Sequence, residues 1–382
     1  METKCIRLGD CILCNPKVKL TKGELYPVID IDKITVGRKY VSNKTFITFA
    51  GQSGCKFENG DTLMARITPC LENGKMAVAK IASKGLGSTE LFVFRSKDGV
   101  TDEEFVYYLL KQQYIRNLAA NSMTGASGRQ RADLKFIKRI KIQLPNLDVQ
   151  HCIASILSTY DTLIENNTKR IRLLEKMAEN LYKEWFVRFR FPGHENVEME
   201  NGLPKGWKVK KYEDEFNVKY GKGLPTDKLT KDGFPVFGSN GQIGYYTSYM
   251  YETPQILISC RGASSGVVNI SLPKSFITNN SLICEMTNET ESVFEYLKYC
   301  FLNTNLVQYQ TGSAQPQITI NNIVKLKLLI PSTDVQIKFA DKVRTLDKEV
   351  GNLQHQNSLL ARQRDLLLPR LMSGKLEVKV KE

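Results

Sequence analysis

Apolar residues recur at alternating steps of four and three along the stretch from Asp148 to about Phe186. This spacing predicts one long helix with an apolar seam, because it returns side chains to the same face about every two turns. The seam residues are Ile153, Leu157, Tyr160, Ile164, Asn167, Ile171, Leu174, Ala178, Leu181 and Trp185. A seam of this length requires a second helix to cover it.

The same pattern returns near the end of the chain. Asp334-Val335-Gln336 repeats Asp148-Val149-Gln150, and the apolar residues that follow keep the same heptad phase. This second seam, interrupted by Arg364, consists of Phe339, Val343, Leu346, Val350, Leu353, Asn357, Leu360, Leu367 and Leu371. We therefore expect the two helices to pair within the chain, which then consists of two similar halves.

Two asparagines favour antiparallel pairing. If the helices run antiparallel with their centres level, Asn167 lies opposite Asn357 and the two amides can hydrogen-bond. Parallel alignment by the repeat would instead set Asn167 against Leu353 and leave a buried amide unpaired. We predict that Asn167 and Asn357 set the register of the coiled coil.

Short β-type runs separated by turn residues precede each predicted helix, which indicates an α+β unit in each half. Phe234-Pro235-Val236-Phe237 corresponds to Tyr26-Pro27-Val28-Ile29, and the strand ending at Arg261 corresponds to the one ending at Arg66. The fold class is therefore α+β, with two α/β domains in tandem and two long helices packed as an intramolecular antiparallel coiled coil. The predicted segments are a first domain (1–147), the first long helix (148–190), a linker (191–202), a second domain (203–332), the second long helix (333–373) and a C-terminal tail (374–382).

Charge indicates the kind of partner. The chain has 54 Lys and Arg against 40 Asp and Glu, a net charge of +14, and such an excess favours a polyanion such as nucleic acid. No stretch approaches the ~20 apolar residues of a membrane span and the N-terminus lacks a signal-peptide core, so we expect a cytoplasmic protein without a membrane partner. Only Cys11 and Cys14 among nine scattered cysteines have C-x-x-C spacing, without a second pair, so we expect free thiols and no metal site.

Several motifs resemble one family. LPKGW opens the second half, and GFPVFGSNGQIGYY, GSAQPQITINNIVKLKLLIPSTDVQ and the closing LLLPRLMSGKL follow. Together they make the chain similar to the specificity subunit of type I restriction-modification systems, over essentially its whole length. The first half carries TGASGRQRADLKFIKRIKIQLPNLDVQ in place of the usual glutamine-bearing form. The resemblance implies two target-recognition domains, each followed by a long helix, with the helices antiparallel.

The resemblance also implies a subunit without catalytic residues or cofactors of its own. Methyltransferase subunits, expected to be two, and restriction/translocase subunits would supply the chemistry with S-adenosylmethionine, ATP and Mg. The motifs agree, because the three histidines (His151, His194 and His355) lack the spacing of a metal site or triad. The chain also contains no N-P-P-aromatic stretch, no G-x-G-x-x-G and no phosphate loop.

Reading double-stranded DNA requires cations for phosphates and forked donors or acceptors for base edges. Predicted loops of the first half supply Arg66, Lys75, Ser127, Arg129 and Arg131. Those of the second half supply Lys222, Ser239, Asn240, Arg261, Ser264, Ser265, Asn279, Asn280, Gln315 and Gln317. Arginine suits guanine and the amides suit adenine, whereas Gly-Ser-Asn clusters also occur as plain turns.

Two readers held apart by a helical strut predict a bipartite target. The seam from Ile153 to Trp185 spans on the order of 50 Å, against ~34 Å per DNA turn, so half-sites about one turn apart fit. The two halves differ in sequence, which predicts an asymmetric target. Two alternatives stay open at this stage: a subunit with its own divergent nuclease or methyltransferase activity, and a basic scaffold that binds DNA without sequence preference.

Overall fold

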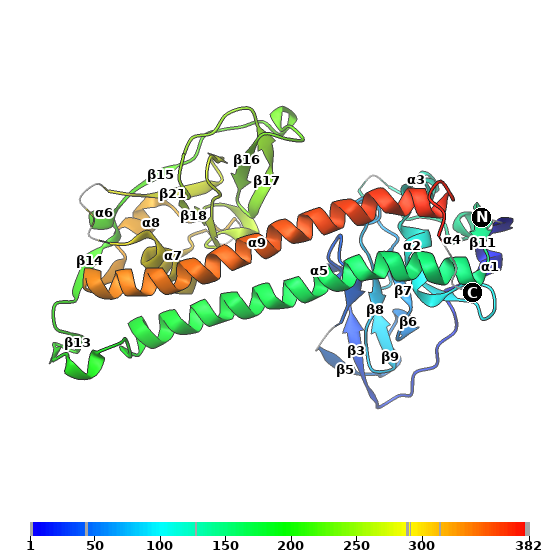
Figure 1. The fold of residues 1–382 in the computed structure, drawn as a ribbon, viewed down its shortest axis with the longest axis horizontal. Helices are drawn as coiled ribbons and strands as arrows, with labels where there is room; N and C mark the ends of the chain where they lie inside the picture. Colours follow the sequence, from blue (N-terminus) through cyan, green and yellow to red (C-terminus); the bar gives the residue numbers. More distant parts are fainter. Residues whose placement is uncertain are drawn as a thin grey trace. The chain divides into compact units, whose positions relative to one another are not determined.

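The computed structural model describes residues 3–42, 45–126, 128–287, 290, 292–312 and 315–378. Its chain divides into two compact units, Met1–Arg170 with Asn352–Glu382, and Ile171–Gly351. Each unit holds an α+β domain and a part of each of two long helices, α5 (Leu147–Tyr182) and α9 (Thr333–Met372) (Figure 1). This is the predicted fold class.

Two small mixed sheets build the first unit. Its strands are β1 (Thr3–Arg7), β2 (Ile12–Cys14), β3 (Leu25–Ile29), β4 (Tyr40–Val41), β5 (Phe46–Thr48), β6 (Cys55–Glu58), β7 (Thr62–Ala65), β8 (Met76–Ala79), β9 (Lys84–Gly87), β10 (Leu91–Ser96) and β11 (Lys141–Pro145). One sheet has the order β2-β10-β7-β8-β4 and the other β5-β3-β9-β6, while β1 pairs with β11. The short helices are α1 (Leu8–Cys11), α2 (Glu103–Lys111), α3 (Gln113–Asn121) and α4 (Leu134–Arg139).

Both faces of the five-stranded sheet are buried, which explains the uninterrupted apolar run in β10. Phe92 and Phe94 point into a core shared with α2, α5 and α9. Leu91 and Val93 point to the opposite face, into a second core. Because successive strand residues alternate between faces, a strand covered on both sides is apolar throughout.

Residues 103–121 form two consecutive helices, α2 and α3, rather than one. Asp102 caps α2 by accepting a hydrogen bond from the Phe105 backbone N–H at 2.7 Å. Gln112, with ψ of 132°, leaves the helical region and separates α2 from α3. Both helices nevertheless face the same core, in which Phe105, Tyr108, Leu109, Ile115 and Ala119 are buried.

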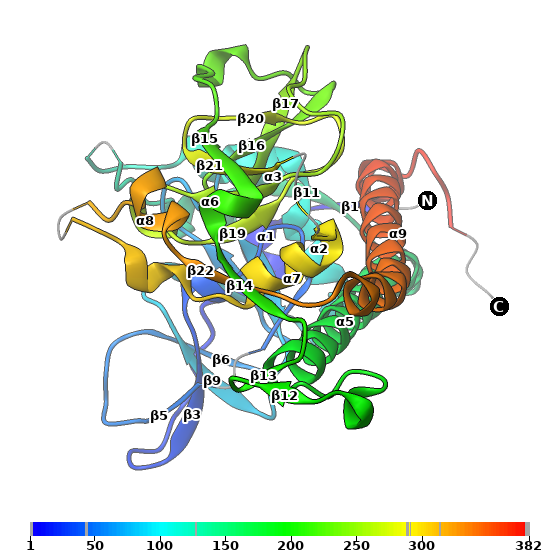
Figure 2. The same ribbon diagram turned by 90° about the vertical axis from the view of Figure 1, so that its left-hand side faces the viewer.

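The second unit, whose strands and short helices are coloured from green to orange in Figure 2, repeats the strand order of the first. Its strands are β12 (Met199–Glu200), β13 (Leu203–Pro204), β14 (Lys208–Lys211), β15 (Phe216–Tyr220), β16 (Phe234–Gly238), β17 (Gly241–Tyr246), β18 (Ile256–Ser259), β19 (Val268–Ile270), β20 (Phe276–Ile277), β21 (Ser281–Met286) and β22 (Lys327–Ile330). The order β15-β21-β18-β19 matches β2-β10-β7-β8, and β17-β16-β20 matches β5-β3-β9, including the parallel pair. Its short helices are α6 (Tyr212–Glu215), α7 (Phe294–Asn303) and α8 (Ile320–Val324).

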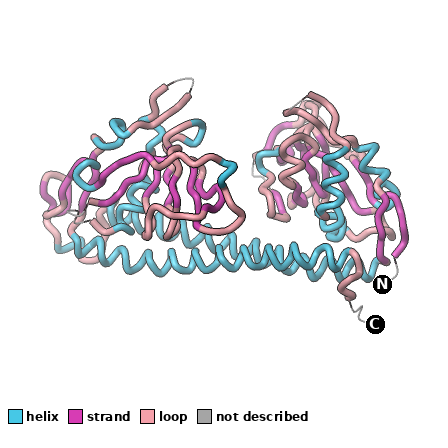
Figure 3. Tube along the Cα trace, turned by 90° about the horizontal axis from the view of Figure 1, so that it is seen from above, coloured by secondary structure: helices cyan, strands magenta, loops and turns pink. Residues whose placement is uncertain are grey.

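The long helices pair antiparallel, as predicted. In the first unit, Ile153 near the start of α5 shares a core with Leu371 near the end of α9. In the second unit the relation is reversed, because Ala178 near the end of α5 shares a core with Phe339 near the start of α9. Every predicted seam residue is buried or half-buried, and both helices run without a break within their bounds (Figure 3).

Polar side chains inside the seam are paired. Asn167 donates from Nδ2 to Asn357 Oδ1 at 3.0 Å and is also 2.8 Å from Gln356 Oε1. Arg364 occupies a seam position with its side chain 2% exposed, and its guanidinium forms an ion pair with the equally buried Asp161. Arg364 therefore continues the seam as one half of a polar pair.

A buried glutamine joins each α+β domain to its long helix. Gln150 donates to the carbonyl oxygen of Pro145 at 2.8 Å and accepts from the backbone N–H of Asp102 at 2.9 Å. Gln336 does the same with Pro331 and with Val293, both at 2.8 Å. Both glutamines are 0% exposed, so the repeated Asp-Val-Gln motif supplies one amide that ties the last strand and the first turn of a domain helix to α5 or α9.

Replacing either glutamine by leucine should destabilise its unit. Gln150→Leu and Gln336→Leu each leave a buried N–H and carbonyl without their partner, at a cost of about 1–3 kcal/mol. Urea unfolding followed by circular dichroism should show an earlier transition for both variants. Gln354→Leu, on the exposed face of α9, is the matched control, and equal midpoints for all three variants would contradict the role of the amides.

We propose that the Asn167–Asn357 pair opposes slipped registers of the seam. Asn167→Leu alone should cost about 1–3 kcal/mol by leaving Asn357 without this partner, and Asn357→Leu in addition should restore stability. Two double-cysteine variants report the register after oxidation. Ile164→Cys with Leu360→Cys joins positions that face each other in the native register. Ile164→Cys with Leu353→Cys joins positions that meet only after a slip of one heptad. The pair with Leu353→Cys should form a disulfide only when both asparagines are leucine; its absence there would refute the register role.

Candidate nucleic-acid interface

In the second unit, backbone hydrogen bonds join the predicted loops at one edge of the domain. The Lys222 carbonyl accepts from Asn279 N–H at 3.1 Å, and the Asn280 carbonyl accepts from Cys260 N–H at 3.0 Å. The Cys260 carbonyl in turn accepts from Ile318 N–H at 3.0 Å. Loops that are up to about a hundred residues apart in the sequence therefore lie side by side.

Two further links complete this edge. Gly238, directly before the Ser239-Asn240 turn, accepts at its carbonyl from the Ser281 hydroxyl at 3.2 Å. Arg261 and Gln317 form an isolated antiparallel bridge, and side chains of directly opposed residues project to the same side. The side chains of Arg261 and Gln317 thus start from neighbouring positions and project to the same side.

Most of the predicted residues of this unit are accessible. The exposed ones are Lys222, Asn240, Arg261, Asn280, Gln315 and Gln317. Ser239, Ser264 and Asn279 are half-buried. Ser265 is only 1% exposed, and its hydroxyl is buried without a hydrogen-bond partner among the described residues. Ser265 therefore does not present its side chain to a ligand in this structure, and its carbonyl oxygen accepts from Gln310 Nε2 at 2.5 Å.

The first unit has the same arrangement of loops. Arg66 accepts at its carbonyl from Ala132 N–H at 2.8 Å, and Ile67 forms a bridge with Arg131. Arg129 is exposed in the same segment. Ser127 lies outside the described residues.

Three basic side chains of this unit already have contacts within the chain. The Arg66 guanidinium lies over the Phe92 ring, 5.1 Å from its centroid. Lys75 donates to the Ile31 carbonyl at 3.0 Å. Arg131 forms a forked ion pair with Glu90, with Nη2 at 2.6 Å from Oε1 and Nε at 2.9 Å from Oε2. Of these three contacts, only the two hydrogen bonds from Arg131 to Glu90 hold a guanidinium in the plane of a carboxylate.

Matching backbone bonds show which positions of the two units are equivalent. Ala132 N–H to Arg66 O in the first unit corresponds to Ile318 N–H to Cys260 O in the second. Arg66 is therefore equivalent to Cys260, and the sequence correspondence of Arg66 with Arg261 is wrong by one residue. The short strands end in loops of different length, so side-chain type alone misplaced the register.

By the same bonds, Arg131 is equivalent to Gln317 and Glu90 to Asn280. The bridge from Ile67 to Arg131 matches that from Arg261 to Gln317, and Arg66 N–H to Glu90 O matches Cys260 N–H to Asn280 O. Glu90 was absent from the predicted site. Its position directly before β10, like that of Asn280 directly before β21, is the feature of the sequence that could have identified it.

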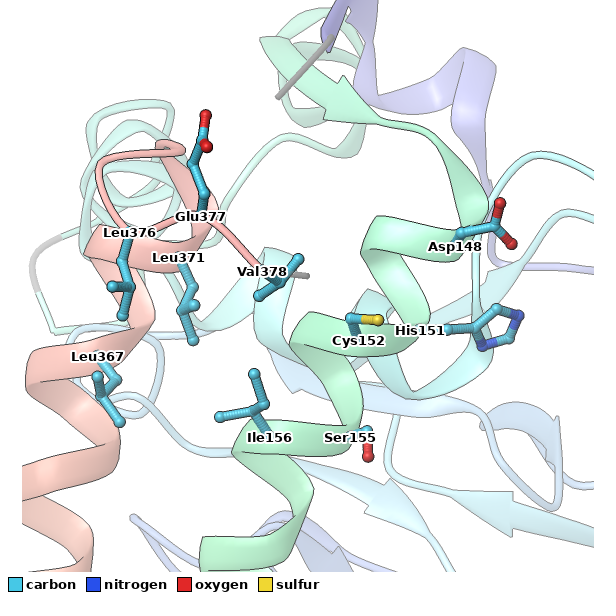
Figure 4. Close-up of a pocket in the computed structure, with 10 residues that line it drawn as sticks. All are labelled: Asp148, His151, Cys152, Ser155, Ile156, Leu367, Leu371, Leu376, Glu377 and Val378. Carbon is cyan, nitrogen blue, oxygen red and sulfur yellow. The ribbon is translucent and has the colours of Figure 1, made fainter. Parts of the chain in front are cut away.

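An apolar groove lies between the start of α5 and the end of α9 in the first unit. Figure 4 shows Leu367, Leu371, Leu376 and Val378 facing Ile156 and Cys152 across it. Its volume is about 690 Å³. Asp148, His151, Ser155 and Glu377 supply its polar lining.

Apolar side chains extend beyond this groove on the flank of the helices opposite the domain. Ser158 and Asp161 of α5 lie on the flank that contacts the domain, where they bond to Lys39 and Tyr108. Heptad positions place Ile156, Leu163, Leu359 and Leu366 on the other flank, and they are 39–61% exposed. In the second unit Leu173 and Met177 are 65% and 57% exposed at the equivalent flank of α5.

The two cysteines of the C-x-x-C motif, Cys11 and Cys14, have raised thiol pKa values. Burial raises the pKa of the Cys11 thiol to about 12 and that of Cys14 to about 11, so both are protonated at neutral pH. In the described part of the chain, no three His, Cys, Asp or Glu side chains are grouped as metal ligands. None of the helices described is long and apolar enough to cross a membrane.

The two units match one family model twice. The model, a type I restriction modification DNA specificity domain, matches residues 3–176 and 204–361. The chain belongs to this family of specificity subunits, which are non-catalytic components of type I restriction enzymes.

Individual relatives agree. The chain is 29% identical over 315 residues to the type I restriction enzyme MjaIX specificity subunit of Methanocaldococcus jannaschii, covering 74% of this chain and 71% of that protein. It is 22% identical over 409 residues to the MjaVIII specificity subunit of the same organism, covering 99% and 94%. A crystal structure of the type I restriction-modification S subunit from M. genitalium has the same fold, with a TM-score of 0.52 and 20% identity over 97% of this chain and 96% of that one.

Proposed function

We propose that this chain reads an asymmetric, bipartite target in double-stranded DNA and directs partner methyltransferase and restriction subunits to it. Residues 1–147 and 203–332 would be the two target-recognition domains, joined through the 148–190 and 333–373 helical segments and the 191–202 linker, with 374–382 as a tail. Each domain would contact one half-site. The two long helices would keep the half-sites at a fixed separation of about one DNA turn.

One observation carries this proposal. The same backbone frame of hydrogen-bonded loops occurs in both units, yet its equivalent positions carry different polar side chains, Arg131 with Glu90 in one and Gln317 with Asn280 in the other. Side chains with forked donors and acceptors are those that distinguish base edges in the major groove. Two frames with different side chains suit two different half-sites, and the net charge of +14 suits the phosphate backbone.

The exposed apolar flank supports docking of partner subunits on the helices. Apolar residues that recur at heptad positions on a solvated helix face are the pattern by which a further helix packs. Because such residues occur on the flank opposite the domain in both units, we propose one methyltransferase subunit on each, two in all. Restriction/translocase subunits would join this assembly.

Cofactors would then belong to the partners. S-adenosylmethionine would bind the methyltransferase subunits, and ATP and Mg the restriction subunits. Such an assembly acts on chromosomal or invading DNA, which supports a cytoplasmic location.

Mapping of methylated bases tests the function. The chain co-expressed with its methyltransferase partner should produce one asymmetric motif of two short parts with a spacer of constant length, read by single-molecule sequencing of the host genome. Arg261→Ala should change one part of the motif and leave the other intact, because Arg261 belongs to the second unit, which would contact a single half-site. Absence of any motif would refute the proposal.

The purified chain distinguishes the alternatives. Alone, it should neither methylate DNA with S-adenosylmethionine nor cut it with a divalent metal. With its partner it should keep preference for motif-containing oligonucleotides as salt is raised, because base contacts survive the loss of phosphate affinity. Equal loss of binding for all sequences would identify a non-specific scaffold instead.

Docking is tested with charges on the apolar flank. The double variant Leu163→Glu with Leu366→Glu should lose co-purification of the methyltransferase subunit, since burying two carboxylates without partners is costly. The matched control is Thr162→Glu with His355→Glu, at exposed positions of the same helices that point away from the seam. Circular dichroism verifies folding, and co-purification equal to wild type in the Leu163→Glu/Leu366→Glu variant would refute docking at this flank.

A further inference from the structure

The ion pair between Arg131 and Glu90 gives one arginine of the first unit a fixed orientation. Arg131 uses Nε and Nη2 toward the two carboxylate oxygens of Glu90, at 2.9 Å and 2.6 Å. A planar guanidinium held at Nε and Nη2 directs the edge formed by Nη1 and Nη2 away from the carboxylate. Nη1 also donates to the Arg129 carbonyl oxygen at 3.4 Å, which leaves the second Nη1 hydrogen and one Nη2 hydrogen for a ligand. The Arg131 side chain is 43% exposed, against 24% for Glu90, so that edge is accessible to solvent.

The surroundings keep Glu90 ionised. Hydrogen bonds from Arg131 hold the pKa of the Glu90 carboxyl below its ordinary value, and the charges of Arg131 and Arg66 act in the same direction. Arg66 is itself held over the Phe92 ring. The cluster of Arg66, Arg129, Arg131 and Glu90 stays net positive, so a carboxylate is tolerated beside the phosphate backbone.

The equivalent place in the second unit holds another base-reading chemistry. Gln317 and Asn280 occupy the positions of Arg131 and Glu90 on the same backbone frame, and both are exposed. Amides pair with the N6 and N7 edge of adenine, whereas a guanidinium pairs with O6 and N7 of guanine. The equivalent position therefore carries a forked hydrogen-bonding group in both units, the cationic guanidinium of Arg131 in the first and the neutral amide of Gln317 in the second.

We propose that Arg131 reads a guanine in the first half-site and that Glu90 is the positioning residue that makes this contact selective. This inference rests on the proposed function. An arginine without a partner bonds to a phosphate as readily as to a base, whereas the fork to Glu90 restricts Arg131 to one direction. Glu90 thus adds specificity, while its negative charge lowers affinity for DNA of any sequence.

Selection from a DNA library in which only the first half-site is randomised tests the proposal. The full chain assembled with its methyltransferase partner is used, and the intact second half-site reports that every variant folds and binds. The wild-type chain should enrich guanine at one position. Arg131→Ala and Arg131→Lys should reduce that preference by roughly 5- to 150-fold, because neither retains the fork.

Glu90→Gln and Glu90→Ala should relax the preference at the same base pair while overall affinity is kept or raised. Arg129→Ala is the matched control: it removes an exposed cation of the same loop, so it should weaken binding and the salt dependence without changing the preferred base. The exchange Glu90→Asn with Arg131→Gln should shift the preferred base from guanine to adenine.

Three results would overturn the proposal. They are an unchanged preference in the Arg131 variants, a changed preference at different base pairs for the two residues, and weaker binding with retained preference in the Glu90 variants. A wild-type chain that selects no motif in either half would instead refute the proposed function. The two failures are therefore distinguishable.

Discussion

The seam between α5 and α9 is the contact on which both units depend, because neither α+β domain closes its core without side chains from both helices. Leu371, close to the end of the described chain, packs in the same core as Leu8 and Ile153. Phe339 packs in the core of the second unit with Ala178 and Trp185. The first unit therefore cannot bury all of its apolar surface until almost the entire chain is present, a long-range dependence of the kind that slows folding.

Polar groups within this apolar contact define where the first domain sits along the helices. Apolar surfaces tolerate small slips, whereas a buried charge or amide that loses its partner is strongly unfavourable. Arg364 and Asp161 pair across the seam, and the Tyr108 hydroxyl of α2 donates to the same Asp161 at 2.5 Å. Lys39, whose pKa burial lowers to about 8, bonds to Ser158 of α5 at 2.8 Å. These bonds connect the first domain to one position of the helix pair.

At the loop edges, the groups that hold the loops together differ from the side chains that face solvent. Backbone N–H and carbonyl groups hold the loops together, so the frame does not depend on which side chains project from it. Arg131 and Gln317 can consequently differ in charge and chemistry on the same frame, and so can Glu90 and Asn280. This separation allows two domains of one fold to carry different side chains at equivalent positions. Ser265, in contrast, is 1% exposed and presents no side chain to solvent.

Several features followed from local sequence alone. Heptad spacing predicted both long helices and their seam, the repeated Asp-Val-Gln motif predicted two similar halves, and the positions of Asn167 and Asn357 predicted antiparallel pairing. These predictions succeeded because helix periodicity, and the position of an amide that must be paired when buried, can both be read from residue spacing. The loops rich in Gly, Asn and Gln were also recognised, since turn chemistry is local.

Other features were decided only by the tertiary structure. Arg364 became a seam residue because Asp161, far away in the sequence, supplies its charge partner. Gln150 and Gln336 became domain ties because strand ends and helix starts meet beside them. The equivalence of Glu90 with Asn280, and of Arg66 with Cys260 rather than Arg261, depends on backbone bonds between distant loops. Spacing along a chain determines which residues share a face of one element, but only folding determines which faces and loop edges meet.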